Sequence, residues 1–222
     1  MSTMHVTSTP SNASQAREAY SGPAAAECLL LAQQLGLGPG LSTERKILGL
    51  TSTTRRAGTT TIAHGLAATI AGWSAREVLL VDAHHAHPAI CRTQNRGIGL
   101  TDVCLGQQEL SQVVTPTATA NLLYLPSGAP PKTPLSPDVL LCESAERFDH
   151  VIIDLPPLEA CHQVLALLTA LDGVVLVVEA DRESRATLGV AREFLERLKV
   201  PLAGAVLNKH RSFCPRWLRW FT

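Results

Sequence analysis

The chain has 222 residues, with 19 Lys and Arg against 19 Asp and Glu, and 45% of its residues are hydrophobic. This length suits one α/β domain with a sizeable core and short tails. The balanced charge argues against general nucleic-acid binding, and the longest apolar runs, such as 174–178, are too short to span a membrane. Six cysteines without a CxxC pair indicate buried, reduced thiols rather than a zinc or redox site.

The chain opens with a Ser- and Thr-rich segment. Residues 1–15 lack the apolar stretch of a secretory signal, so we expect a disordered N-terminal lead and a cytoplasmic protein. A helix follows over 16–35, broken at 21–23, and then a Gly- and Pro-rich loop runs through Gly40.

Short apolar segments then alternate with longer segments of helical spacing, a pattern typical of βαβ units. The predicted strands are Ile47–Ser52, Glu77–Asp82, Leu122–Leu125, His150–Asp154, Gly173–Val178 and Leu202–Leu207. The predicted helices lie near 60–72, 99–106, 136–147, 159–171 and 183–199, and the proline-rich segment 115–137 is a predicted loop with one strand inside. The sequence therefore predicts an α/β fold with a doubly wound, mainly parallel sheet, in a domain over 16–210 that is followed by a tail over 211–222.

The first predicted strand leads through a loop into an Ala-rich helix, where backbone N–H groups and the helix dipole favour a phosphate. The phosphate-loop motif GxxxxGK[ST] survives in part, because Gly58 and Thr60 are in place while Thr53 and Thr59 replace the first glycine and the lysine. The candidate nucleotide-binding residues here are Thr53, Arg55, Arg56, Gly58, Thr59, Thr60 and Thr61. A simple N-cap cluster for the helix is an equally good explanation of the threonines.

Two buried strands end in a carboxylate, at Asp82 and at Asp154. Because the carboxyl ends of parallel strands meet at one edge of a sheet, both side chains would lie beside the phosphate loop. Carboxylate oxygens are suitable ligands for Mg²⁺, so both are candidate metal ligands, and Asp82 is the candidate catalytic group that would activate a hydroxyl. Strand-end capping is the alternative.

Two further segments invite an interpretation. His84, His85 and His87 could bind zinc or nickel, but a surface loop is the favoured reading. The tail over 211–222 holds four of the nine aromatic residues and three arginines, which favours contact with a membrane interface or a partner's groove. Folding back over the edge of the sheet is the alternative.

Together these segments resemble the cytoplasmic ATPase domain of bacterial tyrosine kinases of the capsular and exopolysaccharide type, within the MinD, ParA and Mrp group of P-loop proteins. The resemblance runs from about Glu18 to Asn208. It is carried by Glu18-Ala19-Tyr20, the phosphate loop, Asp82 with Pro88, 99–103 with Gly106, 125–128, 148–157, 172–178 and 206–208. It implies a P-loop NTPase-like fold, ATP or ADP with Mg²⁺ as ligands, and Asn208 near the base.

Several residues that carry the family's chemistry differ here. The family's loop lysine grips the β- and γ-phosphates and is Thr59 here, and the family's second acidic residue after Asp82 is His84. Loss of one charged hydrogen bond weakens binding roughly ten- to a hundredfold. Loss of one cation at a transferring phosphate costs about 10³ to 10⁵ in rate. The family's tyrosine-rich tail is also missing, since the chain has only Tyr20 and Tyr124.

The hypothesis is therefore a degenerate relative of these kinases that regulates or docks in exopolysaccharide or capsule synthesis or export. The resemblance implies a place at the inner face of the plasma membrane, with a chain-length determinant of the polysaccharide copolymerase type or a competent kinase as partner, and self-association besides. One alternative is an active ATPase or tyrosine autokinase, in which Arg55 or Arg56 replaces the lysine and Tyr20 or Tyr124 accepts phosphate. The other is a membrane-surface scaffold of the MinD or ParA kind, held by its tail.

Overall fold

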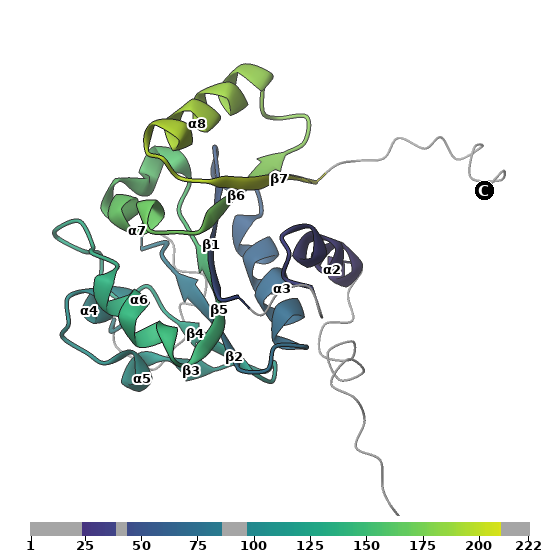
Figure 1. The fold of residues 1–222 in the computed structure, drawn as a ribbon. Coiled ribbons are helices and arrows are strands. Elements are labelled where there is room, and N and C mark those ends of the chain that lie inside the picture. Colours follow the sequence, from purple (N-terminus) through teal and green to yellow (C-terminus); the bar gives the residue numbers. More distant parts are fainter. Residues whose placement is uncertain (1–23, 39–43, 86–96, 210–222) are drawn as a thin grey trace, which may run out of the picture.

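The computed structural model describes residues 24–38, 44–85 and 97–209 (Figure 1). Several predicted features fall outside these ranges: the lead over 1–15, the break at 21–23, the Glu18-Ala19-Tyr20 motif, His87, Pro88 and the tail over 211–222. None of the helices within the described ranges combines the length and the apolar character that crossing a membrane requires.

A seven-stranded sheet forms the centre of the described structure. Its strands are β1 (Lys46–Ser52), β2 (Glu77–Asp82), β3 (Thr115–Pro116), β4 (Leu122–Leu125), β5 (Phe148–Asp154), β6 (Gly173–Glu179) and β7 (Leu202–Asn208). They lie in the order β3-β4-β2-β5-β1-β6-β7, and every pair is parallel except β3 with β4. The predicted mainly parallel α/β sheet is thus confirmed.

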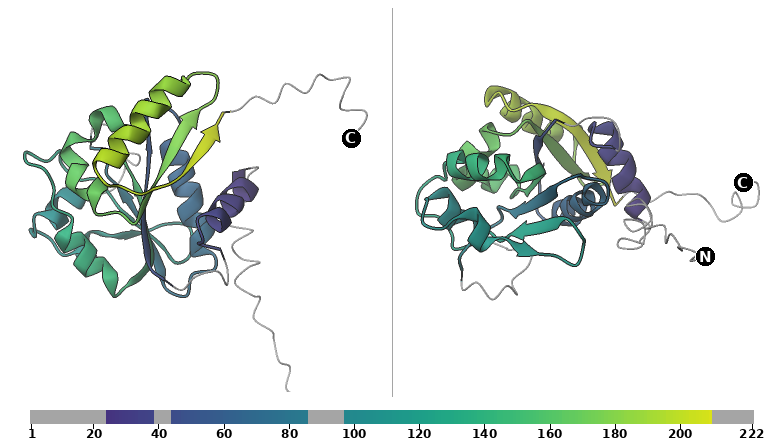
Figure 2. Two further views of the ribbon diagram at one scale, coloured as in Figure 1. Left: turned by 45° about the horizontal axis from the view of Figure 1, so that its top comes forward. Right: turned by 60° about the horizontal axis from the view of Figure 1, so that its bottom comes forward.

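Helices cover both faces of this sheet (Figure 2). They are α2 (Ala24–Gln34), α3 (Thr59–Ala71), α4 (Leu100–Cys104), α5 (Leu110–Val113), α6 (Asp138–Ala145), the 3₁₀ helix η1 (Leu158–Val164), α7 (Leu165–Thr169) and α8 (Arg185–Arg197). The apolar side chains of α2 and α3 pack in one core cluster, and those of the other helices pack on the opposite face. Alternate residues of each central strand contribute to the two clusters, so these strands are apolar throughout.

The helix that follows the phosphate loop is held by small and branched residues. Leu66 and Ile70 of α3 are fully buried against β-strand residues such as Leu50 and Ile152. Full burial of a leucine or isoleucine contributes about 1.5–3 kcal/mol each. This packing fixes the first turn of α3, and with it the loop before the helix, relative to the ends of the strands.

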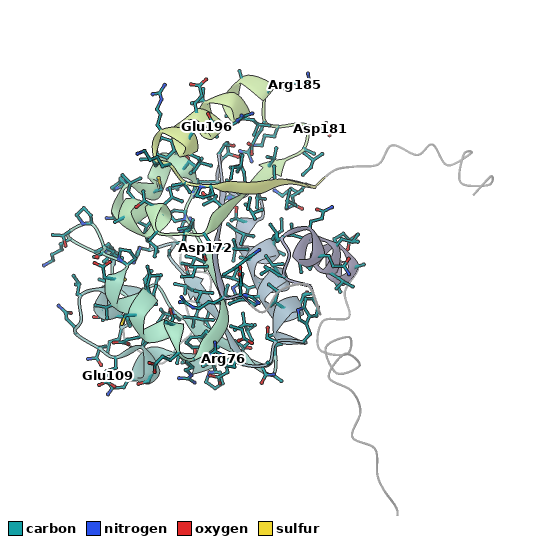
Figure 3. The ribbon with its side chains drawn as sticks, viewed as in Figure 1. Arg76, Glu109, Asp172, Asp181, Arg185 and Glu196 are labelled. Carbon is teal, nitrogen blue, oxygen red and sulfur yellow. The ribbon has the colours of Figure 1, made fainter. Side chains whose placement is uncertain are left out.

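The last described helix is amphipathic and has a defined start. The Ser184 hydroxyl accepts a hydrogen bond from the Thr187 N–H at 3.1 Å, an N-cap arrangement. Ala191 and Leu195 face the sheet, whereas charged residues such as Arg185 and Glu196 lie along the outer side of α8 (Figure 3). The predicted helix over 183–199 is therefore present in slightly shorter form.

The structure differs from the sequence-based elements in several places, including the short helix α5, which the sequence does not predict. The helix predicted over 159–171 is divided into η1 and α7, and its first turn is tight because the Pro157 carbonyl accepts from the Ala160 N–H at 2.7 Å. The helix predicted over 99–106 ends at Cys104, before Gly106 with a φ of 66°. The predicted loop over 115–137 contains the edge strand β3 as well as β4. Pro116 suits an edge position because it lacks an N–H.

Candidate nucleotide site

The phosphate loop between β1 and α3 has a backbone that only glycine accommodates at its last position. Gly58 precedes α3 with a φ of 98°, in the left-handed region. A Cβ atom built there would lie 2.1 Å from Nδ2 of Asn208, a distance that no real contact reaches. Conformation and space therefore both favour glycine at position 58, since a larger residue would need a left-handed backbone and would displace the Asn208 side chain.

The ends of β6 and β7 hold this loop from one side. Asn208 donates from Nδ2 to the Ala57 carbonyl at 2.7 Å, and Lys209 donates from Nζ to the Arg56 carbonyl. The Glu183 carboxylate accepts hydrogen bonds from the hydroxyls of Thr53 and Thr54. The loop is thus fixed before any ligand arrives, which reduces the ordering cost of binding one.

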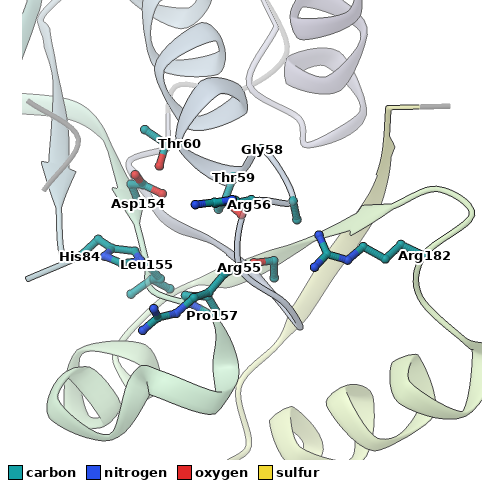
Figure 4. A pocket seen from close by; sticks show the side chains of 12 residues that line it. Arg55, Arg56, Gly58, Thr59, Thr60, His84, Asp154, Leu155, Pro157 and Arg182 are labelled. Atoms are coloured by element: carbon teal, nitrogen blue, oxygen red, sulfur yellow. The ribbon is translucent and has the colours of Figure 1, made fainter. Parts of the chain in front are cut away.

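A pocket of about 660 Å³ opens in front of the loop. Its lining combines three arginines, several hydroxyl groups, one histidine and one carboxylate (Figure 4). The lining residues are Ser52, Arg55, Arg56, Ala57, Gly58, Thr59, Thr60, His84, Asp154, Leu155, Pro157 and Arg182. Positive charge, a backbone cradle and hydroxyl donors are the groups that a polyphosphate needs.

The structure brings together most of the residues predicted to bind nucleotide or metal. Arg55, Arg56, Gly58, Thr59, Thr60 and Asp154 all line the pocket. Thr53 and Asn208 do not line it and instead hold the loop in place. Thr61 is exposed on α3 outside the pocket, because the helix turns its side chain away from the loop.

Asp154 is a buried carboxylate without a hydrogen-bond partner. It is 1% exposed, and neither of its carboxylate oxygens has a partner among the described residues. Its pKa is raised to about 7, mainly by burial and to a smaller extent by neighbouring Asp82. The Thr60 hydroxyl approaches Asp154 and lowers the pKa in part, although no hydrogen bond of ordinary geometry forms (Figure 4). Two unpartnered oxygens that face a pocket are well placed to receive a cation.

Asp82 lies beside Asp154, but its carboxylate, unlike that of Asp154, accepts hydrogen bonds. The two aspartates are direct partners in the register of β2 and β5. Asp82 is also 1% exposed, and it accepts hydrogen bonds from the His84 N–H at 2.8 Å and the Tyr124 hydroxyl at 3.0 Å. It does not line the pocket. The residue predicted to activate an attacking hydroxyl is therefore behind the pocket wall.

The histidine tract is divided between two environments. His84 lines the pocket, whereas His85 is 8% exposed and places Nε2 3.0 Å from the Thr101 hydroxyl. Burial lowers the pKa of His85, so its neutral form is favoured. The expectation of a surface loop is thus wrong for His85. Among the described residues, no group of three His, Cys, Asp or Glu side chains is arranged to hold a metal ion.

Two sequence motifs of the resemblance meet next to this tract. The Leu100 N–H donates to the Pro126 carbonyl at 2.7 Å, and a Cβ atom on Gly99 would lie 2.3 Å from the Gly128 nitrogen. The Thr101 hydroxyl donates to the Ala129 carbonyl at 2.7 Å. These motifs therefore join the start of α4 to the loop after β4, close to His85.

No family model matches the chain. The chain is 32% identical over 178 residues to the tyrosine-protein kinase CpsD of Streptococcus agalactiae, a match that covers 75% of this chain and 76% of that protein. The chain belongs to the bacterial tyrosine kinase family.

Comparison with solved structures shows that this bacterial tyrosine kinase family member has the P-loop NTPase fold. Its fold is similar to that of the VpsO kinase domain, with a TM-score of 0.68, 24% identity, and coverage of 90% of this chain and 96% of that one. It is also similar to MinD of Pyrococcus horikoshii complexed with Mg-ADP, with a TM-score of 0.59, 20% identity, and coverage of 75% and 71%. The fold expected from the resemblance is thereby confirmed.

In this member of the bacterial tyrosine kinase family, four residues near the site have roles that the sequence analysis did not predict. Arg182 lines the pocket, Glu183 and Lys209 hold the loop, and Tyr124 binds Asp82. The first three follow the carboxyl ends of β6 and β7, where ligand sites of open α/β sheets lie, and this was the available signal. The Tyr124 contact depends on the β2–β4 register, which the sequence does not display.

Proposed function

We propose that this chain binds a nucleoside di- or triphosphate with Mg²⁺ and uses it as a regulatory ligand, without efficient phosphoryl transfer. One observation carries the proposal: the binding groups Gly58, Thr60 and Asp154 line the pocket, whereas Asp82 does not. The chain has Thr59 at the position where the family has the lysine that neutralises the transferring phosphate. Binding tolerates such a loss far better than catalysis, because transfer depends on charge stabilisation in the transition state.

The residues present fit the implied ligands. The unpartnered oxygens of Asp154 and the neighbouring Thr60 hydroxyl are suitable donors for Mg²⁺, which commonly uses one or two carboxylates together with substrate phosphates. Mg²⁺, when bound, supplies neutralisation of phosphate charge. The Gly58 backbone would hold the phosphates, and Arg55 and Arg56 would add charge at the pocket wall.

The active autokinase is the second candidate, and the pocket arginines are the observation that favours it. Arg55, Arg56 and Arg182 all line the pocket. Arg182 is paired with Glu179 at 2.9 Å, which offsets part of its charge. Tyr124 does not support this candidate as a phosphate acceptor, because it is 2% exposed and its hydroxyl is bonded to Asp82.

The pathway and partner of the proposal come from the family resemblance. We place the chain in exopolysaccharide or capsule synthesis or export, beside a membrane chain-length determinant or a competent kinase. Its position at the inner face of the plasma membrane would then come from that partner. Co-purification of the full chain with a chain-length determinant from membranes, in the presence and absence of Mg-ADP, tests this part of the proposal.

Calorimetric titration with Mg-ATP and Mg-ADP tests the central proposal, together with assays of ATP turnover and phosphotyrosine. We expect binding, a loss of Mg²⁺ dependence in Asp154→Asn, and turnover no greater than that of Asp82→Asn. Arg182→Ala should weaken nucleotide binding, whereas the matched control Arg192→Ala should not, because Arg192 lies on α8 outside the pocket. Sustained hydrolysis that disappears in Asp82→Asn would overturn the regulatory reading in favour of the autokinase.

A further inference from the structure

Among the residues that the structure describes, none covers the outer edge of β7, where apolar side chains are exposed. This strand pairs only with β6 among the described strands, so its outer side presents unpaired backbone groups. Leu207 is 58% exposed and Leu202 is 40% exposed. An apolar edge of this kind promotes association unless another element covers it.

Next to this edge lies a groove of about 340 Å³ between α2, α3 and β7, which we call the β7 groove. It is lined by Glu27, Cys28, Leu31, Ile62, Val206, Leu207 and Asn208. Its walls are mainly aliphatic, and Glu27 carries the only charge among these lining residues. Leu30, adjacent in α2, is 59% exposed and extends the apolar surface.

We propose that the chain's own C-terminal segment, residues 211–222, packs in the β7 groove. The segment follows β7 directly: Asn208 lines the groove, and position 211 is three residues further on. Five extended residues span up to about 17 Å, so Phe213 and the residues after it are within reach of the groove.

The composition of the segment matches the groove. Phe213, Trp217 and Leu218 supply apolar side chains for the aliphatic walls, and aromatic side chains bury about 150–250 Å² each. Arg211, Arg216 and Arg219 supply positive charge opposite Glu27. A Trp- and Arg-rich segment against a concave apolar surface is also the usual composition of a binding hot spot.

Tethering favours this occupant over a second copy of the chain. A short flexible connection gives an effective concentration in the mM range, on the order of a thousandfold above a μM protein solution. The segment in the same chain therefore competes strongly with the same segment in another chain. The free edge of β7 and the groove are then covered within one molecule.

Disulfide trapping tests the proposal in the full chain. The variant Leu31→Cys is made with Cys28→Ser and Cys142→Ser, so that the introduced thiol in the groove faces native Cys214 of the segment. Under mild oxidation we expect an intramolecular disulfide between position 31 and Cys214, at least about tenfold faster than from the matched control Ser111→Cys, exposed on α5. The rate should not change on dilution. Ile62→Glu, which charges the groove wall, should slow it.

Three results would overturn the proposal. Equal rates from positions 31 and 111 would show that the segment does not prefer the groove. A disulfide that forms between chains, detected as a crosslink of a labelled to an unlabelled chain in an isotopic mixture, would show that a second copy occupies the groove. Trapping no faster than in the control, together with co-sedimentation of the chain with vesicles of phosphatidylcholine and phosphatidylglycerol, would show that the segment binds a membrane instead. Circular dichroism of Ile62→Glu separates a lost contact from a lost fold.

Discussion

Thr59 lies where a nucleotide-binding loop usually carries its cation, and it is 8% exposed in the pocket wall. Thr59→Lys places an ammonium group among the residues that line the pocket and leaves the rest of the phosphate loop unchanged. A charged hydrogen bond to phosphate contributes about 1.5–3 kcal/mol, so we expect ATP affinity to rise roughly ten- to a hundredfold in calorimetric titrations.

The control for that gain is Thr61→Lys, which adds the same charge to an exposed position of the same helix. A general electrostatic effect would raise the affinity in both variants alike. If Thr59→Lys gains nothing while the protein stays folded, the loop is not a phosphate site.

At Asp154, burial makes stability depend on pH. The pKa of this carboxyl rises from an ordinary 3.8 to about 7 in the folded state. The folded chain therefore holds a proton that the unfolded chain releases, and the associated stability is complete below pH 3.8 and is lost as pH rises through about 7. The loss amounts to at most about 4 kcal/mol.

Asp154→Asn is neutral at every pH, so its free energy of unfolding relative to the parent should rise between pH 5 and pH 8. Urea unfolding in EDTA measures this difference. Asp149→Asn is the comparison: burial alone would raise the pKa of Asp149, but hydrogen bonds from Arg76 lower it, so that variant should show no relative change over this interval. A flat difference for Asp154→Asn would mean that its pKa is near normal.

At the scale of elements, the phosphate loop and the end of β7 are fitted to each other. In Gly58→Ala the new methyl group meets Asn208, and the residue must also adopt a left-handed backbone. We expect a loss of about 1–3 kcal/mol in the free energy of unfolding. The double variant Gly58→Ala/Asn208→Ala separates the two causes.

Removal of the Asn208 side chain relieves its clash with the methyl group introduced at position 58, but the free-energy cost of a left-handed backbone at that position remains. The two substitutions should therefore be non-additive in chemical denaturation, with the double variant more stable than the sum of the single losses implies. Strict additivity would show that Asn208 and position 58 are not in contact.

The sequence predicts an element well where its residues form a clear apolar run or a regular periodicity. Strands β1, β2, β4 and β6 lie within one residue of their predicted bounds, because short, mainly apolar runs mark buried parallel strands. The predicted start of β5, at His150, lies two residues after the observed start at Phe148, because Asp149 interrupts the apolar run. The 3₁₀ turns of η1 have no distinct periodicity in the sequence, so the pattern predicts α-helix there.

The site was predictable where one local segment forms it and not where distant segments meet. Gly58 and Thr60 belong to a readable motif, and the ends of β2 and β5 place Asp82 and Asp154 together. The bonds from Thr53 and Thr54 to Glu183 join residues about 130 positions apart. No local pattern predicts that contact, because it depends on how the β6–α8 connection folds over the loop.

At the scale of the whole molecule, the sheet is unequally protected from its centre to its β7 edge. β1 pairs on both sides, and most of its residues are buried. β7 pairs on one side and is exposed or half-buried throughout. Amides of β1 and β5 should therefore exchange with solvent only on global unfolding, whereas those of β7 should exchange through smaller local openings.

Hydrogen exchange followed by mass spectrometry measures this gradient peptide by peptide. We expect protection in β1 to follow the free energy of global unfolding as urea is added, and protection in β7 to depend on urea much less. Equal protection across the sheet would contradict the gradient and indicate a single cooperative unit that reaches the edge.

The bond between Tyr124 and Asp82 has a practical consequence for assays of protein phosphorylation. The chain has two tyrosines, and this one lies in β4 with its hydroxyl enclosed by the sheet and its covering helices. A kinase that modified it would first have to separate β4 from β2. An antibody signal traced to the peptide that contains Tyr124 would therefore count denatured molecules, and it would serve as a quality marker for the preparation rather than as a record of signalling.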